Sequence, residues 1–168
     1  MIPVRLQPVE SADLDRIAAL HAKCFPGESW DRQALGEVMA MPGAGAWQAV
    51  SLARGRIGEV LGFIFDTAIA GQGEVLTIGI APLARRQGIA RALLENLFER
   101  HKKLHVAAIT LEVAQDNVAA QRLYESQGFR IAGRRPAYYR RSGGPPVDAW
   151  ILRRMLIEER NWPEGSVQ

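Results

Sequence analysis

A short basic run, Arg85-Arg86-Gln87-Gly88-Ile89-Ala90, combines guanidinium groups with a glycine at a point where the chain turns. It follows an apolar stretch, Val75 to Ala81, typical of a strand, and opens an amphipathic stretch, Ile89 to Lys103, typical of a helix. Such a turn exposes several backbone N–H groups at the positive end of a helix dipole, which favours a bound anion. A pyrophosphate is the bulky anion that this turn serves most simply. The alternative is a basic turn in which Gly88 only permits the bend.

Two known phosphate-binding motifs do not describe this run. No Gly-Lys-Ser/Thr follows it, as a Walker A loop requires. It also lacks the three glycines of a dinucleotide fingerprint, and the acidic residue about 20 positions later. The sequence therefore indicates an anion other than NAD, and other than an ATP phosphate chain held in the manner of a P-loop.

One carboxylate, Glu112, lies in an otherwise apolar strand, Ile109-Thr110-Leu111-Glu112-Val113. The period of two residues puts Thr110 and Glu112 on one face and the apolar residues on the other. Strands flanked by helices in βαβ units usually have both faces covered, so a carboxylate there needs a reason. General-base chemistry is a common one. The alternative is a solvated carboxylate on an exposed face.

Two polar side chains follow on the next helix. Asn117 and Tyr124 are seven residues apart, which is about two helical turns. Asn117 is well suited to cap that helix. If the Tyr124 phenol faces the same cleft as Glu112, it is a good proton donor to a leaving group. The alternative for Tyr124 is a core aromatic residue whose hydroxyl finds a partner nearby.

The elements that hold these residues follow from hydrophobic period and from turn residues. We predict one mixed α/β domain over residues 1–157 and a frayed tail over residues 158–168. Ser29 is expected to cap the second helix, and Arg54-Gly55-Arg56 to join the second and third strands. The expected elements are strands at 4–9, 46–53, 57–66, 74–81, 107–113, 129–133 and 147–155, helices at 14–21, 29–39, 88–103 and 118–127, and a loop at 138–146.

Composition limits the class of protein. The chain has 168 residues, 48% hydrophobic and 23% charged, which is ordinary for one globular domain with a real core. No stretch approaches the roughly 18 apolar residues of a membrane span, and the N-terminus does not resemble a secretion signal. The single cysteine, Cys24, cannot form an internal disulfide, and no Cys/His spacing suggests a metal site. We therefore expect a cytoplasmic protein without membrane partner or metal.

Together these motifs resemble the GNAT superfamily of acetyl-CoA-dependent N-acetyltransferases. The signature of that family, Arg/Gln-x-x-Gly-x-Gly/Ala, stands here at residues 85–90. More narrowly, four further segments look like the RimI branch, which acetylates protein N-termini, in bacteria the N-terminal alanine of the eighteenth small-subunit ribosomal protein. These segments are Leu111-Glu112-Val113, Asp116-Asn117, Leu123 to Phe129, and Tyr138-Tyr139.

The resemblance implies a fold and a co-substrate. It implies a single GNAT-like α/β domain with a seven-stranded, mostly antiparallel sheet and helices on both faces. The strands at 74–81 and 107–113 would run parallel and splay apart, and acetyl-CoA would enter the gap. Backbone groups of Ile78, Gly79 and Ile80 would pair with the pantetheine arm, and Asn117 would contact that arm near the thioester. The residues that would hold the pyrophosphate are Arg85, Arg86, Gln87, Gly88, Ile89, Ala90 and Arg91.

The same resemblance assigns the chemistry. Glu112 would take a proton from the substrate amine through water, and Tyr124 would protonate the departing CoA thiolate. Trp30, Tyr138 and Tyr139 would line the acceptor cleft. The expected reaction is acetyl transfer to a protein N-terminal α-amine, and the expected partner is a ribosomal protein. An α-amine has a pKa of about 7.7–8.0 against about 10.4 for lysine, so it is the easier amine to deprotonate at neutral pH.

Other functions stay open. Within the same enzyme class, the acceptor could be a small amine or a lysine side chain. From another class, the chain could be a non-catalytic acyl-CoA sensor or a ribosome-assembly module, although the Glu112 and Tyr124 pair argues against an idle protein. A net charge of +3 requires no nucleic acid, and we expect no direct nucleic-acid recognition. RNA or an acidic protein is the alternative partner for the arginines at 130, 134, 135, 140 and 141.

Overall fold

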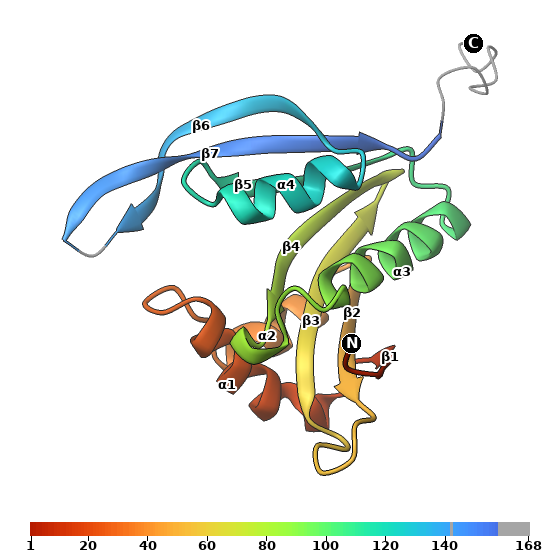
Figure 1. Cartoon of the computed structure of the whole chain (residues 1–168). Helices are drawn as coiled ribbons and strands as arrows, with labels where there is room; N and C mark the ends of the chain where they lie inside the picture. The colour runs from red at the N-terminus through yellow and green to blue at the C-terminus, as the bar shows by residue number, and fades with distance from the viewer. Residues whose placement is uncertain (142, 158–168) are drawn as a thin grey trace.

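Seven strands form one sheet in the order β1-β2-β3-β4-β5-β7-β6 (Figure 1). The structure is a computed structural model that describes residues 1–141 and 143–157. Every neighbouring pair of strands is antiparallel except β4 and β5, which run parallel. The predicted sheet is therefore confirmed. The strands are β1 (Val4–Pro8), β2 (Ala44–Ser51), β3 (Val60–Ile69), β4 (Gln72–Ile80), β5 (Ala108–Ala114), β6 (Arg130–Arg141) and β7 (Gly144–Met155).

Helices cover both faces of the sheet, as predicted. The helices are α1 (Leu14–Cys24), α2 (Arg32–Met39), α3 (Ile89–Lys103) and α4 (Val118–Ser126), with short 3₁₀ turns η1 (Ser11–Asp13) and η2 (Pro82–Ala84). The apolar faces of α1 and α2 pack with β3 in one buried cluster. Those of α3 and α4 pack with β3, β4 and β5 in a second cluster on the other face. Within the described ranges, no helix combines the length and the apolar character that crossing a bilayer requires.

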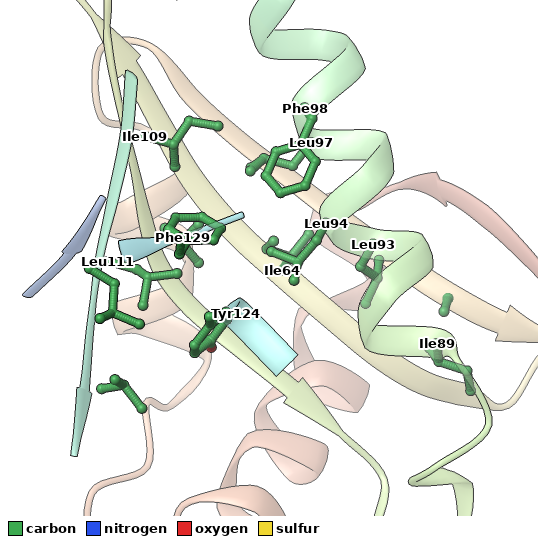
Figure 2. Close-up of a cluster of buried hydrophobic side chains, with 14 of the residues drawn as sticks. Ile64, Ile89, Leu93, Leu94, Leu97, Phe98, Ile109, Leu111, Tyr124 and Phe129 are labelled. Atoms are coloured by element: carbon green, nitrogen blue, oxygen red, sulfur yellow. The ribbon is translucent and has the colours of Figure 1, made fainter. Parts of the chain in front are cut away.

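The second cluster explains why α3 forms where it does. Its apolar residues recur at helical spacing, so they lie along one side of the helix and face the sheet. Leu93 and Leu97 are fully buried there, together with Ile64 of β3 and Ile109 of β5. Figure 2 shows these side chains meeting between α3 and the strands, with Tyr124 of α4 at one end of the cluster. This core fixes α3 and α4 against the middle of the sheet.

The parallel strands β4 and β5 pair over only four residues. Gln72–Val75 lie opposite Ala108–Leu111, and beyond this point β4 pairs only with β3 and β5 only with β7. A β-bulge marks the place where they part, because Leu76 is an extra residue on β4 between two successive partners on β3. A bulge bends its strand locally. The predicted splaying of these two strands is thus confirmed.

The prediction of a loop at 138–146 was wrong, because this stretch is the end of a long β-hairpin formed by β6 and β7. Pro136 lies in β6, the edge strand of the sheet, where a proline nitrogen can face solvent. Pro145 and Pro146 lie in β7 before Ala149, where pairing with β5 begins. The prolines therefore occupy positions that a sheet tolerates.

Several boundaries differ from the predictions by a few residues. The connection between β2 and β3 covers residues 52–59, which is longer than the three-residue turn expected. The helix α2 is capped by Asp31, not by Ser29, because the Asp31 carboxylate accepts a hydrogen bond from the N–H of Ala34 at 2.8 Å. The predicted frayed tail at 158–168 lies outside the described residues.

Candidate active site

A cavity of about 710 Å³ occupies the gap between β4 and β5. Its wall combines β4, β5, the start of α4, the end of β6, and the segment between α1 and α2. The bulge and the short parallel pairing create this space, since they remove the backbone contacts that would otherwise close it. Of the predicted site residues, those that line the cavity are Trp30, Ile78, Glu112, Asn117, Tyr124 and Tyr139.

Glu112 lies on the cavity side of β5. Its neighbours Leu111 and Val113 are buried in the core on the other face, as the period of two predicts. The Glu112 side chain is 19% exposed, and its Oε1 lies 2.5 Å from Nε of Arg135 on β6. It is therefore a half-enclosed carboxylate with a cationic partner, rather than the fully solvated carboxylate of the alternative interpretation.

Tyr138 lies beside the same carboxylate but does not line the cavity. A hydrogen bond to Glu112 is the main cause that raises the pKa of Tyr138, and partial burial adds to it. The guanidinium carbon of Arg135 lies 5.5 Å from the centre of the Tyr138 ring. Tyr138 is thus placed next to Glu112 on the outer, half-exposed side of the site.

Tyr124 is a core aromatic residue that also lines the cavity. Its ring is 6% exposed and packs edge-on against Phe129, with 5.8 Å between ring centroids (Figure 2). Its residue also lines the cavity, and no other described residue makes a hydrogen bond to its hydroxyl. Burial raises the pKa of Tyr124 well above its usual value, with a smaller contribution from Tyr139. The phenol is therefore a neutral donor throughout the physiological range.

Tyr139 and Asn117 complete this part of the wall. Burial raises the pKa of Tyr139 to about 12, and the nearby charge of Glu112 contributes to the same shift. Asn117 is the N-cap of α4, because its Oδ1 accepts a hydrogen bond from the N–H of Ala120 at 3.1 Å. The predicted cap is confirmed. Asn117 lines the cavity, and no acceptor in residues 1–141 or 143–157 bonds to its side-chain N–H groups.

The basic loop before α3 lies outside the 710 Å³ cavity. Arg86 and Gly88 both have a left-handed backbone, with φ of 61° and 81°. No acceptor in the described part of the chain bonds to the N–H groups of residues 86–91. Nothing lies within 4 Å of the position that a Cβ of Gly88 would occupy. The loop therefore presents a row of N–H donors to open space at the start of a 15-residue helix.

Other residues predicted to bind the cofactor also contribute to hydrogen bonding or packing within the protein. Arg85 donates from Nε to the carbonyl of Ile80 at 3.3 Å, which ties the loop to the end of β4. The Ile89 side chain is buried in the core, so only its backbone faces the loop. A Cβ at Gly79 would lie 2.5 Å from Cζ of Phe63. Glycine is thus required there by packing on the α1 face, a reason that the sequence did not reveal.

The arginine-rich stretch forms strand β6 rather than a loop, and three of its arginines have carboxylate partners. Arg134 lies 3.3 Å from Asp148, and Arg141 lies 2.8 Å from Asp116. The third is Arg135, which pairs with Glu112 as described above. Much of the positive charge that crowds this stretch of sequence is therefore balanced by acidic residues from β5, from β7 and from the turn between β5 and α4.

Sequence reasoning missed two residues of the site. Arg135 was noted only as part of the arginine-rich stretch, and its contact with Glu112 depends on the pairing of β6, β7 and β5. His21 is the last residue of the helix predicted at 14–21 and has no predicted role, yet it is 2% exposed and lines the cavity. The one signal in the sequence is a histidine on the apolar face of a helix. This signal does not show which residues the imidazole contacts.

The comparisons with known proteins agree with this geometry. Residues 14–129 match the acetyltransferase (GNAT) family. The chain is 34% identical to the N-alpha-acetyltransferase RimI of Mycobacterium tuberculosis (strain ATCC 25618 / H37Rv), over 90% of this chain and 92% of that one. It is 38% identical to the [ribosomal protein bS18]-alanine N-acetyltransferase of Escherichia coli (strain K12) over 87 residues, which are 52% of this chain and 59% of that enzyme.

Solved structures show the same fold. The ribosomal-protein-S18-alanine N-acetyltransferase from Escherichia coli superposes with a TM-score of 0.83 and 26% identity, over 95% of this chain and 99% of that one. Arabidopsis thaliana NAA60 in complex with acetyl-CoA gives a TM-score of 0.80 and 22% identity, over 91% and 98% of the two chains. With a family match over most of its length and a full-length relative, this chain belongs to the GNAT family and is an N-acetyltransferase that uses acetyl-CoA as co-substrate.

Proposed function

We propose that this N-acetyltransferase acetylates the α-amine of protein N-termini, and that its acceptor is the N-terminal alanine of the eighteenth small-subunit ribosomal protein. The names of the two relatives support the proposal, since one is an N-alpha-acetyltransferase and the other acts on alanine of ribosomal protein bS18. The observation that carries it is that Glu112 and Tyr124, from opposite sides of the parted sheet, line one cavity.

Glu112 is the proposed general base. Its carboxylate lies at the cavity on the α1 and α2 face of the sheet, and Arg135 holds it in place. It accepts the proton of the acceptor amine through a water molecule. An α-amine with a pKa of about 7.7–8.0 needs only a modest base at neutral pH, whereas a lysine costs about 3.4 kcal/mol more to deprotonate. This lower cost of deprotonation favours an N-terminus as the acceptor.

Tyr124 is the proposed general acid. Acetyl-CoA supplies an activated acetyl thioester, and the leaving thiol resembles cysteine, with a pKa of about 8.5. Burial keeps the Tyr124 phenol protonated, so it can donate a hydrogen bond to the departing sulfur and share its proton late in the step. The ring is held by Phe129 in the core, which fixes the direction of the hydroxyl.

The remaining predicted residues are proposed to bind the two substrates. The N–H row from Arg86 to Arg91 holds the pyrophosphate, and a Cβ at Gly88 would keep that backbone away from it. Beyond the bulge, β4 has no partner on the β5 side, so the backbone of Ile78–Ile80 can pair with the pantetheine arm, close to Asn117.

The acceptor is proposed to approach from the sheet face that α1 and α2 cover, opposite to the face on which α3 and its basic loop lie. Trp30, in the segment between α1 and α2, and Tyr139, near the end of β6, line that side of the cavity, and Tyr138 lies beside Glu112. A ribosomal protein as acceptor places the reaction in the cytoplasm. We propose no direct nucleic-acid recognition, in keeping with the carboxylate partners of the arginines on β6.

Three synthetic peptides test the proposal. One begins with a free alanine in the sequence of the ribosomal protein, the second is the same peptide with a blocked N-terminus, and the third carries only an internal lysine as acceptor. We expect acetylation of the first peptide alone, detected by mass spectrometry. Turnover confined to the lysine peptide or to small amines would refute the proposal. Mass spectrometry of ribosomal proteins from cells with and without the enzyme identifies the natural acceptor.

A further inference from the structure

A buried imidazole beside the cavity uses both of its ring nitrogens. His21 of α1 is 2% exposed. Its Nδ1 accepts a hydrogen bond from the backbone N–H of Trp30 at 3.1 Å, and its Nε2 lies 3.2 Å from Oγ1 of Thr77. Trp30 belongs to the segment between α1 and α2, and Thr77 lies on β4 directly after the bulge. His21 therefore connects the two sides of one cavity wall.

The surroundings of His21 fix its protonation state. Its ring stacks between Trp30 and Phe63, with centroid distances of 5.3 Å and 5.4 Å, and Phe25 packs against it at 4.6 Å. Burial lowers the pKa of His21 to about 4, so the ring is neutral at physiological pH. A neutral imidazole has one N–H donor and one acceptor nitrogen. Because Nδ1 accepts from Trp30, the proton is on Nε2 and is donated to Thr77.

This assignment determines what the Thr77 hydroxyl can do. A hydroxyl oxygen that accepts from His21 still has its own hydrogen to donate. Among the described residues, His21 is the one hydrogen-bond partner of Oγ1. Thr77 is half-buried and lines the cavity together with His21. Its O–H bond is therefore free to point at whatever fills that space.

In the proposed function, the acceptor binds on this side of β4. His21, Phe25 and Trp30 come from α1 and the segment after it, on the sheet face that α1 covers. The N–H row of the basic loop leads into α3, which packs on the opposite face. A donor on the α1 face thus meets the acceptor polypeptide, whose backbone offers amide carbonyls close to the reacting amine.

We propose that His21 and Thr77 form a fixed pair that presents the Thr77 hydroxyl to an amide carbonyl of the acceptor, and that this pair selects amines with a carbonyl nearby. The inference rests on the proposed function and adds a specificity-determining contact to it. Thr77 touches the acceptor, whereas His21 is a positioning residue that acts through Thr77.

The first test removes the hydroxyl alone. Thr77→Val keeps the branched shape of the side chain, and Thr77→Ser keeps the hydroxyl and loses only the methyl group. One neutral hydrogen bond corresponds to a change of about fivefold. We expect Thr77→Val to lower kcat/KM for the alanine-start peptide by about that factor through KM, with acetyl-CoA affinity unchanged, and Thr77→Ser to restore most of it. An equal loss of acetyl-CoA affinity would overturn the proposal.

The second test weakens the carbonyl instead. A thioamide at the first or the second peptide bond of the acceptor leaves the α-amine intact but makes that position a poorer hydrogen-bond acceptor. We expect one of these two peptides to lose about fivefold in kcat/KM with the wild-type enzyme and nothing further with Thr77→Val. If both thioamide peptides behave alike with the wild type and with Thr77→Val, the proposed contact does not exist.

Two substitutions of His21 separate its hydrogen bonds. His21→Gln places an amide N–H near the position of Nε2, and His21→Asn places an amide oxygen near that of Nδ1. We expect His21→Gln to keep the thioamide effect and His21→Asn to lose it, a difference that overall stability does not produce. Melting temperatures show whether each variant folds, and the Thr77 series decides the proposal if a His21 variant does not.

Failure of the proposed function gives a different result. A wild-type enzyme that ignores the alanine-start peptide but acetylates a lysine peptide refutes the N-terminal specificity, and the thioamide pair is then placed around that lysine. A thioamide effect around the lysine that disappears in Thr77→Val still supports the proposed contact. Efficient acetylation of simple amines that lack any carbonyl, unchanged in Thr77→Val, overturns the inference itself.

Discussion

Removal of one oxygen atom, in the variant Tyr124→Phe, tests the proposed chemistry most directly. The ring keeps its edge-on contact with Phe129 and its place in the core. No protein hydrogen bond to the hydroxyl is lost among the described residues, so we expect the free energy of unfolding to change by less than about 1 kcal/mol. The variant therefore separates the chemistry of the phenol from its packing.

The expected loss is in kcat. A positioned general acid contributes about 10²- to 10⁴-fold, and 10²-fold corresponds to about 2.7 kcal/mol in the activation barrier. We expect Tyr124→Phe to lower kcat by at least about 10²-fold. The affinity for acetyl-CoA should stay unchanged, because the predicted contacts with the cofactor lie elsewhere. Since burial raises the pKa of Tyr124, ionisation of this group should cause no loss of wild-type activity up to about pH 10.

The assay follows release of the CoA thiol with a chromogenic thiol reagent, and acetyl-CoA binding is measured separately by calorimetry. Tyr138→Phe is the matched control, because it removes the same atom from a half-exposed ring. It costs a hydrogen bond to Glu112, for which we expect a loss of only about fivefold. A folded Tyr124→Phe enzyme within about threefold of wild type, or no more impaired than Tyr138→Phe, would refute the role of Tyr124 as general acid.

Three further perturbations test other parts of the structure. Glu112→Gln should lower kcat by about 10²-fold or more at unchanged acetyl-CoA affinity, and a rate near wild type in steady-state assays would exclude Glu112 as the base. Gly88→Trp should weaken acetyl-CoA binding more than about tenfold in a titration, or about 1.4 kcal/mol. Gly58→Trp, at a similar φ of 84° and equally open space in the 52–59 connection, should leave that binding unchanged. Asp66→Ala should lower the free energy of unfolding in urea by about 3–5 kcal/mol, since it leaves the Arg100 guanidinium and the buried His101 ring without their carboxylate partner. Burial alone would raise the pKa of Asp66, but the hydrogen bonds from the adjacent histidine and arginine outweigh it and lower the pKa. The difference between wild type and Asp66→Ala should therefore be full above about pH 4 and shrink as the pH falls through the lower folded-state pKa.

Local patterns in the sequence predicted the parts of the site that depend on local geometry. The alternation around Glu112 places the carboxylate opposite the core face because successive residues of a strand point to opposite sides. Asn117 caps its helix because the cap needs only the N–H groups of the next three residues. Gly88 adopts a left-handed backbone that the turn into α3 requires.

The remainder depends on contacts between distant segments. The bulge at Leu76 arises from the register of β4 against β3, and nothing in its immediate neighbours signals it. The ion pair between Arg135 and Glu112 requires β7 to lie between their strands. His21 meets Thr77 across 56 residues of chain. Such partners are set by the assembled sheet, so a single sequence read along its length does not identify them.

The short pairing of β4 with β5, which joins β1–β4 to β5–β7, has a consequence for the lifetime of the enzyme. We call this pairing the seam. Only four pairs of residues join β4 to β5, so the backbone there is the least reinforced part of the sheet. In the proposed binding mode, acetyl-CoA lies beside the seam, between β4 and β5, and would contact both halves of the sheet. A ligand at a hundred times its Kd adds about 2.7 kcal/mol to the stability of a folded chain. We therefore expect proteolysis of this enzyme to be slower at high acetyl-CoA concentration and faster when the acetyl-CoA concentration falls.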